Sequence, residues 1–437
     1  MIDQDNCTES TGRKATESRR YRWQRAAAKG CLLVFSTAIC LVLGEVALRL
    51  IDVAPIPPAY GDAVLGFTAG RNRTMTFEFP EYGGRLTMHV NNAGFYEDLD
   101  TKLVKPQGVY RMMFVGDSQT AGECANSESY PHVASAIITR TLGNETVEGL
   151  NAGAGRYSPY QYFVKTQSQL LAFGPDHLIV GIYMGNDMMD LLRRDDRPYL
   201  VKSADGTLRH HSPDFILLDD PETPPSDLSD IRLYGLFWRA IGSGARYQVT
   251  RAKILMHDTS NNGRGMGDVL RYMMDVKRLS DISIGFMTQA LLQFVWFQHF
   301  PESLPLALEM NQHVLNRFKR MAESNKVKLT YVLIPSKVVV EPADFPDVLQ
   351  KVQHYNGRYT LERIQAFENH LTDLVAQQCQ ESGIRVIDLR EPLLAAHPGR
   401  RLYNPLEMHL TVAGNKVVGK VIAEALGQEV RSTAQPR

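Results

Sequence analysis

Residues 109–120 read VYRMMFVGDSQT and predict a strand followed by a sharp turn. The run from Val109 to Val115 is mostly apolar, and Gly116 ends it. A short apolar run that stops at a turn residue is typical of a buried strand. Four more runs of this kind follow: Thr146–Leu150, His177–Met184, Lys328–Ile334 and Gly383–Leu389.

Helical patterns separate these five runs. They cover residues 127–141, 158–173, 306–325, 360–381 and 412–426. Strands that alternate with helices predict βαβ units, and therefore an α/β fold with a parallel sheet covered by helices on both faces. Ligands of such sheets bind at the carboxyl ends of the strands. The residues just after each run are therefore the candidates for chemistry.

Residues 190–300 interrupt this alternation and predict an insertion. Residues 193–230 are rich in Asp, Pro and charge, which indicates loop, and three helical segments follow at Leu233–Ile241, Val269–Val276 and Ile282–Phe300. The last segment has no charged side chain, but its glutamines argue against a membrane span. A second crossing would also separate the last two strands from the first three. We expect either a lid at the mouth of the site or a helical layer without a substrate role.

Length, charge and cysteines limit the function classes. The chain has 437 residues, enough for one large domain with insertions or for two domains. Lys plus Arg and Asp plus Glu are 48 each, so no excess of positive charge points to nucleic acid. None of the five cysteines forms a CxxC pair, so neither a zinc site nor a disulfide scaffold is indicated. Cys124 and Cys379 remain candidates for a single disulfide.

The N-terminus carries a targeting signal. Residues 1–30 form a polar tail with a basic end, and residues 31–53 form an apolar stretch broken by Glu45 and Arg49. Together with the flanking apolar residues, this stretch is long enough to cross a membrane. The basic flank places the N-terminus in the cytoplasm and the rest of the chain outside. No A-x-A cleavage pattern follows, so we expect a retained single-pass anchor and a periplasmic or extracellular domain.

Polar residues follow three of the strands. Ser118 stands in the first turn beside Asp117, and its hydroxyl would face the cleft. Residues 151–158 (NAGAGRYS) follow the second strand and bring Gly153 and Gly155, which allow close backbone approach to a ligand. The third strand ends in Gly185, Asn186 and Asp187. Taken singly, these are also the residues of helix caps and tight turns.

A histidine completes the set near the C-terminus. His409 stands in the segment EMHLT just before the last helix, with Glu407 two residues earlier. A histidine oriented by a carboxylate is a suitable general base for a serine nucleophile.

We call these segments blocks one to four: the turn of Ser118, residues 151–158, Gly185 to Asp187, and the segment of His409. Their order along the chain resembles that of the SGNH hydrolases, also called GDSL-like lipases and esterases. The resemblance covers residues 109–427, and the segment NNAGFYED (91–98) with the anchor resembles membrane-anchored bacterial members. It implies a three-layer α/β/α flavodoxin-like fold, Ser118 as nucleophile and His409 as base, with no cofactor or metal. It also implies an oxyanion hole from the Ser118 N–H, a glycine N–H of the second block and the Asn186 amide.

Two positions depart from the family pattern. The usual spacing after Asn151 would place the oxyanion residue at Arg156, which requires a negative φ, unless the loop is one residue shorter and Gly155 serves. The family usually has Asp two or three residues before the histidine, where this chain has Leu406 and Glu407. We expect Glu407 to be the third member, with a backbone carbonyl as the fallback. Asp388 is expected to be structural.

The domain boundaries follow. We expect a cytoplasmic tail at 1–30, an anchor at 31–53, a linker and approach segment at 54–108, the hydrolase domain at 109–427 and a tail at 428–437. The predicted function is hydrolysis of ester bonds, including O-acetyl groups, outside the cytoplasm. The alternatives are an O-acyltransferase acting on envelope polysaccharide and a non-catalytic envelope protein on the same fold. The expected partners are an ester or acylated glycan and the membrane, with no nucleic acid.

Overall fold

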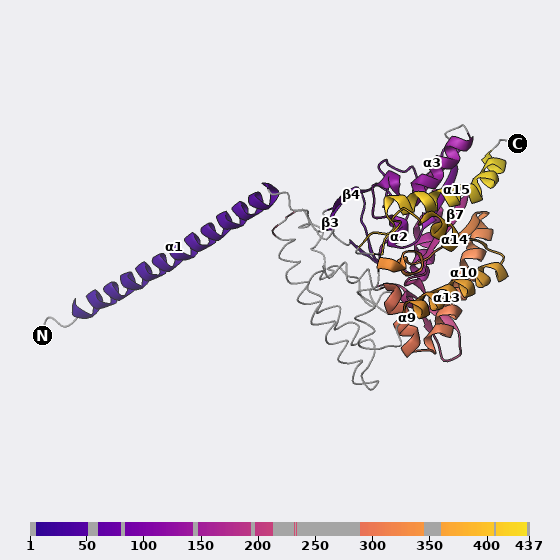
Figure 1. Ribbon diagram of the computed structural model, residues 1–437. Helices are drawn as coiled ribbons and strands as arrows, with labels where there is room; N and C mark the ends of the chain where they lie inside the picture. The colour runs from indigo at the N-terminus through magenta and orange to yellow at the C-terminus, as the bar shows by residue number, and fades with distance from the viewer. Residues whose placement is uncertain are drawn as a thin grey trace.

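A parallel five-stranded sheet forms the centre of the protein in a computed structural model (Figure 1). The residues it describes are 6–50, 60–79, 84–142, 147–193, 197–212, 231, 233, 289–344, 360–405 and 408–434. The strands lie in the order β11-β10-β7-β5-β6. Counted along the chain, this is the order 2-1-3-4-5 read from the other edge, as in flavodoxin.

The strands coincide with the predicted runs. They are β5 (Tyr110–Val115), β6 (Val147–Asn151), β7 (His177–Tyr183), β10 (Lys328–Ile334) and β11 (Arg385–Asp388). All four pairings are parallel, for example Met113 opposite Leu178 and Tyr331 opposite Val180. β5 and β7 are buried along their whole length, which explains why their sequences are apolar rather than alternating.

Helices cover both faces of the sheet. One face packs against α3 (Tyr130–Leu142) and α15 (Val412–Ala434), and the other packs against α4 (Pro159–Lys165), α10 (Ser303–Asn325) and α13 (Leu361–Glu381). Alternate residues of β5 divide between the two cores, with Phe114 on the first face and Val115 on the second. The α/β fold with two helical layers is therefore confirmed.

The ends of the predicted helices differ from those of the observed helices, and α10, for example, begins at Ser303 rather than at 306. The predicted helix at 158–173 is α4 followed by a π-helical turn at Thr166–Leu170 and a 3-10 turn at Leu171–Phe173. The predicted helix at 127–141 begins later, at Tyr130. α15 continues to Ala434, so part of the expected tail at 428–437 is helical.

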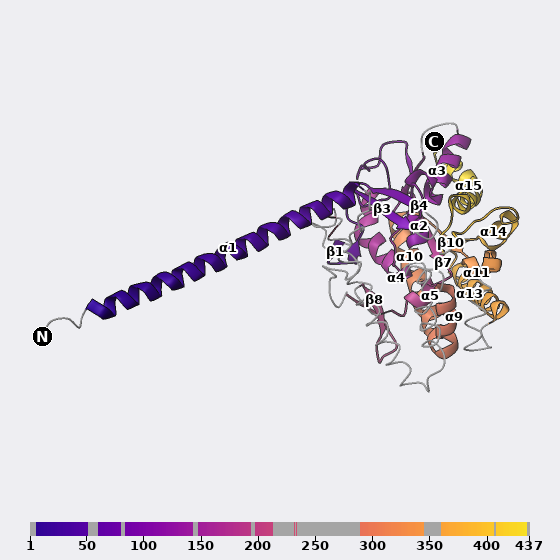
Figure 2. The same ribbon diagram turned by 60° about the vertical axis from the view of Figure 1, so that its left-hand side comes forward.

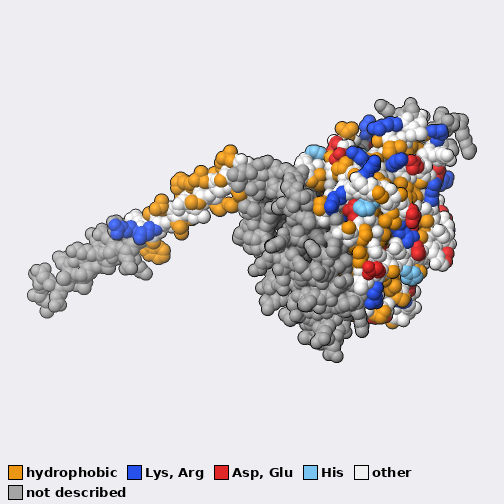
Figure 3. All heavy atoms as spheres, viewed as in Figure 1, with side chains coloured by type: hydrophobic (Ala, Val, Ile, Leu, Met, Phe, Trp, Pro, Cys, Tyr) orange, Lys and Arg blue, Asp and Glu red, His pale blue; other side chains and the backbone are white. Residues whose placement is uncertain are grey.

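The N-terminal helix α1 (Asn6–Leu50) lies apart from the sheet in both ribbon views (Figure 2). Its segment Trp23–Leu50 is long and apolar enough to cross a membrane, with a mean hydropathy of 2.3 and none of its 18-residue apolar window buried. Apolar side chains line this segment, and basic side chains gather toward its N-terminal end (Figure 3). Arg49 forms an ion pair with Glu45 at 2.8 Å, which neutralises the two charges that interrupt the apolar stretch.

The approach segment forms short antiparallel pairs. β1 (Tyr60–Asp62) pairs with β2 (Gly66–Thr68), and β3 (Arg73–Phe79) pairs with β4 (Gly84–Val90). A turn follows β4, where the Asn91 side-chain oxygen accepts from the N–H groups of Ala93 and Phe95. Tyr96 N–H then donates to the carbonyl of Asn151, which attaches the segment to the end of β6.

The insertion is described at its two ends. β8 (Tyr199–Lys202) pairs with β9 (Leu208–His211), and α9 (Gln289–His299) closes the insertion. The helices predicted at 233–241 and 269–276 lie outside the described residues, apart from Leu233. In α9, Phe294 and Phe297 pack against Phe367 of α13, so the described part of this uncharged helix belongs to the core rather than to a second span.

Close packing of α3 on α15 generates a stability prediction. A Cβ atom added to Gly419 would lie 2.6 Å from Cβ of Val133, whereas one added to Gly427 would meet nothing within 4 Å. We expect Gly419→Ala to lower the free energy of unfolding by about 1–3 kcal/mol through overpacking. Gly427→Ala, on the same helix, should raise it by about 1 kcal/mol through helix propensity. Thermal unfolding of both variants would contradict this if the two shifts had the same sign.

Candidate active site

The serine turn follows β5 directly. Ser118 is the first residue of the short helix α2 (Ser118–Ala121), and the Asp117 carboxylate caps it by accepting from the N–H of Gln119 at 2.9 Å. A Cβ atom on Gly116 would lie 2.9 Å from the carbonyl oxygen of Gly181 in β7. The turn therefore crosses so close to β7 that residue 116 must be glycine.

His409 meets this serine from the other end of the chain. Its Nε2 lies 2.7 Å from Ser118 Oγ, and the two residues are 291 positions apart in sequence. The imidazole is almost completely buried, and its Nδ1 lies 3.1 Å from Oε1 of Glu123. A proton on Nδ1, beside this carboxylate, leaves Nε2 as the acceptor for the Ser118 hydroxyl.

Glu123 is a candidate site residue that the sequence interpretation missed. It follows Gly122, which leaves α2 with a φ of +83°, so the chain turns back toward the histidine. The expected third member, Glu407, lies outside the described residues. A glutamate five residues after the serine was the available signal, but only the positive φ of Gly122 brings it to Nδ1.

The loop that carries His409 is anchored on both sides. Buried Lys337 donates from Nζ to the carbonyls of Asn404 and Pro405, both at 2.7 Å. At the start of the last helix, the Asn415 side chain accepts from the N–H of Tyr130 at 3.0 Å and donates to the carbonyl of Leu410. The histidine is thus tied to α3, which follows the serine turn in sequence.

The second block lies beside the serine. A Cβ atom on Gly153 would lie 2.2 Å from the N of Ala121, whereas one on Gly155 would lie 3.7 Å from Cβ of Ser118. Gly153 therefore permits the loop to pack on α2, and Gly155 is the glycine next to the nucleophile. Arg156 has a φ of +69°, so the negative φ that its expected oxyanion role required is not present.

Lys165 binds the backbone of the second block at Ala152. Its fully buried Nζ donates to the carbonyl of Ala152 at 2.8 Å and lies 5.8 Å from the ring centre of Tyr157. Burial lowers the pKa of Lys165 to about 8. The backbone oxygen and the aromatic face supply part of the solvation that the charged group has lost.

The third block follows β7, the neighbour of β5. The Asn186 Nδ2 donates to Oδ2 of Asp190 at 2.8 Å, while its buried Oδ1 has no hydrogen-bond partner in the structure. Because a carboxylate only accepts, this bond determines which end of the amide is the nitrogen and leaves the second N–H of Nδ2 for another acceptor. Asp187 accepts from the hydroxyl of Tyr162 and the N–H of Tyr183. Gly185 packs against the ring of Tyr183.

Ser118 and Asn186 therefore follow the two strands between which the strand order reverses. Ligands of open α/β sheets bind at this position. The strand order, the serine turn after β5 and its contact with a histidine before the last helix agree with the family resemblance. The chain has the three-layer α/β/α flavodoxin-like fold that this resemblance implies.

Comparisons with known proteins add distant likenesses. No family model and no curated protein matches the chain. The solved structures it resembles include a lipase/acylhydrolase from Enterococcus faecalis, 11% identical, covering 75% of this chain and 99% of that chain with a TM-score of 0.35. An acetyl xylan esterase variant from Geobacillus stearothermophilus is 10% identical and covers 74% and 97%, also with a TM-score of 0.35. Because the identities and TM-scores are this low, activity is inferred from the residues of the site.

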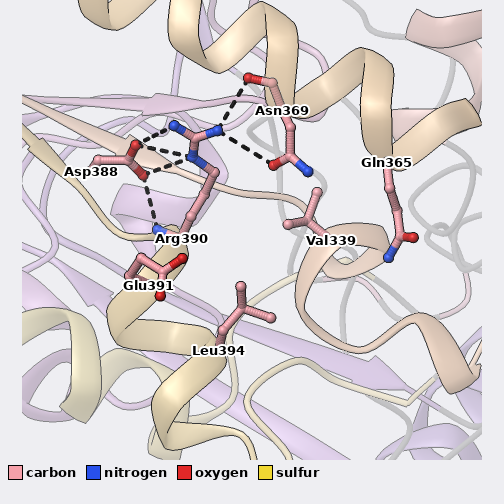
Figure 4. A pocket seen from close by; sticks show the side chains of 7 residues that line it. All are labelled: Val339, Gln365, Asn369, Asp388, Arg390, Glu391 and Leu394. Carbon is pink, nitrogen blue, oxygen red and sulfur yellow. Dashed lines mark hydrogen bonds and ion pairs between the residues drawn. The ribbon is translucent and has the colours of Figure 1, made fainter. Parts of the chain in front are cut away.

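Asp388 belongs to a separate pocket (Figure 4). Its carboxylate binds the guanidinium of Arg390, which also contacts Asn369 and Asp373. This pocket of about 500 Å³ is lined by Val339, Gln365, Asn369, Asp388, Arg390, Glu391 and Leu394. Asp388 therefore has the structural role expected of it, as one half of an ion pair.

Two cysteines remain among the candidates that the sequence offered. Cys124 and Cys379 are free and buried, so the disulfide considered for them is not formed. Burial raises the pKa of both thiols to about 12. Among the residues that the structure describes, no three His, Cys, Asp or Glu side chains form a group that could hold a metal ion.

Buried carboxylates beneath the serine generate a pH prediction. Burial raises the pKa of Asp117 from 3.8 to about 6, and nearby Asp190 adds to this. A raised pKa means that the folded protein holds the proton more tightly than the unfolded chain. Below pH 4, this proton contributes its full amount, about 3 kcal/mol, to the free energy of unfolding. The contribution is lost as the pH rises through 6.

Asp117→Asn removes this titration while keeping an N-cap acceptor. We expect the variant to match the wild type near pH 4 and to exceed it in unfolding temperature above pH 7. Thermal unfolding of the full chain from pH 4 to 8 measures this. The same pH slope in both proteins would contradict the assignment.

Proposed function

We propose that the protein hydrolyses ester bonds through an acyl-serine intermediate. The observation that carries this proposal is the 2.7 Å hydrogen bond between Ser118 Oγ and His409 Nε2, with Oε1 of Glu123 lying 3.1 Å from His409 Nδ1. Three residues in this arrangement have the roles of nucleophile, general base and orienting carboxylate. The carboxylate comes from the nucleophile's own turn, so this site does not depend on an acid in the histidine loop.

The first half of the reaction acylates the serine. His409 Nε2 takes the proton of Ser118 Oγ as this oxygen attacks the ester carbonyl, and Glu123 stabilises the imidazolium that forms. The tetrahedral intermediate collapses when the carbon–oxygen bond to the alcohol breaks, and His409 returns the proton to the leaving alcohol. In the second half, water loses a proton to His409, attacks the acyl group and releases the carboxylic acid and free Ser118.

The oxyanion hole is proposed from three donors. The Ser118 N–H lies at the N-terminal end of α2, and the Gly155 backbone lies beside Ser118. The second N–H of the Asn186 amide completes the set, since Asp190 holds the first. Donors that are already in place stabilise the developing negative oxygen without reorganisation.

The cellular position is proposed from the N-terminal helix. The segment Trp23–Leu50 would span the membrane, and the basic residues before it would keep the N-terminus in the cytoplasm. The hydrolase domain would then face the envelope, where O-acetyl groups on polysaccharide are the proposed substrate class.

Substitutions of Glu123 and Glu407 test which of the two carboxylates orients His409. We expect Ser118→Ala to abolish turnover of a chromogenic acetyl ester by the full chain in detergent micelles. Glu123→Gln should lower kcat by roughly 10² to 10⁴-fold because the imidazole loses its orienting charge. Glu407→Gln, the matched control, should change kcat by less than about tenfold. A large loss in Glu407→Gln alone would instead support the usual position of the acid.

A reporter fusion tests the proposed topology. Alkaline phosphatase joined to the C-terminus of the full chain should be active, because that enzyme folds to its active form only outside the cytoplasm. The same reporter joined before residue 1 should be inactive. The reverse result would place the hydrolase domain in the cytoplasm and exclude an envelope substrate.

A further inference from the structure

Two buried glutamines outside the triad bind the loops that carry the functional residues. Gln119 is only 2% exposed and directly follows the nucleophile. Its Nε2 donates to the carbonyl of Met408 at 2.7 Å, and its Oε1 accepts from the N–H of Leu410 at 3.2 Å. These two backbone groups are on either side of His409. The side-chain amide of Gln119 therefore joins the loop that carries His409 to the turn that carries Ser118.

Gln293 of α9 makes the same arrangement around the third block. It is 1% exposed, its Nε2 donates to the carbonyl of Met184 at 2.6 Å, and its Oε1 accepts from the N–H of Met189 at 3.0 Å. Asn186 lies between these two backbone groups in the chain. The uncharged helix at the end of the insertion thus reaches the loop that carries an oxyanion donor.

We propose that Gln119 and Gln293 are positioning residues that hold His409 and Asn186 in their reactive geometry. This inference rests on the proposed esterase function. A primary amide has a donor and an acceptor at its tip, so a single side chain can pair with a backbone C=O and an N–H of an irregular loop. Such loops have no sheet or helix partner for these groups, and a small displacement of a catalytic group greatly lowers the rate.

A merely structural role is the competing explanation, because any buried amide that loses its partners destabilises the fold. Gln378, which is half-buried, provides the control. Its Nε2 donates to the carbonyl of Leu308 at 2.9 Å, and its Oε1 accepts from Asn311 at 2.8 Å. It joins α13 to α10 and contacts neither functional loop in these bonds. Its loss removes a similar pair of hydrogen bonds.

The experiment compares Gln119→Leu, Gln293→Leu and Gln378→Leu in the full chain in detergent micelles. All three should unfold at lower temperature than the wild type. At a temperature where all are folded, kcat for the acetyl ester should fall by about 10²-fold in the first two with KM changed less than threefold. Gln378→Leu should keep the wild-type kcat. Wild-type kcat in Gln119→Leu and Gln293→Leu, or an equal loss in Gln378→Leu, would overturn the proposal.

If a leucine variant does not fold, Gln119→Glu and Gln293→Glu provide the same comparison. Each keeps the acceptor and the side-chain shape but loses the donor to the carbonyl of Met408 or Met184, so kcat should still fall. Hydrogen exchange read by mass spectrometry separates this inference from the esterase proposal. Exchange should rise locally at Leu410 in Gln119→Leu and at Met189 in Gln293→Leu, because these N–H groups lose their acceptors. A wild type without turnover would refute the esterase proposal, whereas unchanged exchange would refute the positioning role.

Discussion

The hydrogen bond between Ser118 and His409 requires two segments at opposite ends of the domain to meet within 2.7 Å. Packing on one face of the sheet satisfies this requirement. α3 follows the serine turn, α15 follows the histidine, and the two helices pack against each other, with Asn415 accepting from the N–H of Tyr130 at their ends. The reactive contact is therefore a consequence of helix packing, and the apolar layer beneath it keeps both turns in register.

The segment from Ser118 to Glu123 concentrates the site in six residues. It supplies the serine hydroxyl that meets His409, the amide that binds the backbone on both sides of His409, and the carboxylate near Nδ1. The loop that carries His409 supplies the imidazole, the carbonyl of Met408 and the N–H of Leu410. This arrangement explains physically how the chain can differ from the usual pattern before the histidine while the serine and the imidazole still meet.

Charge beneath the site comes at a cost in stability. Asp117 and Asp187 are almost fully buried, and burial raises the pKa of each carboxyl. Both accept hydrogen bonds that shape the turns after β5 and β7. A core made only of apolar residues would be more stable at neutral pH, but it could not hold these turns in the conformation that presents Ser118 and Asn186.

The sequence by itself determined the five strands, the two helical layers and the identity of the serine and the histidine. Apolar runs that end at turn residues are local patterns, and the positions after them are set by the geometry of parallel sheets. Only the tertiary structure decided that Glu123 reaches Nδ1, that Arg156 has a positive φ and that Gln293 holds the loop of Asn186. Each of these depends on a backbone torsion or on a contact between distant segments. Neither kind of feature produces a periodic pattern in the sequence.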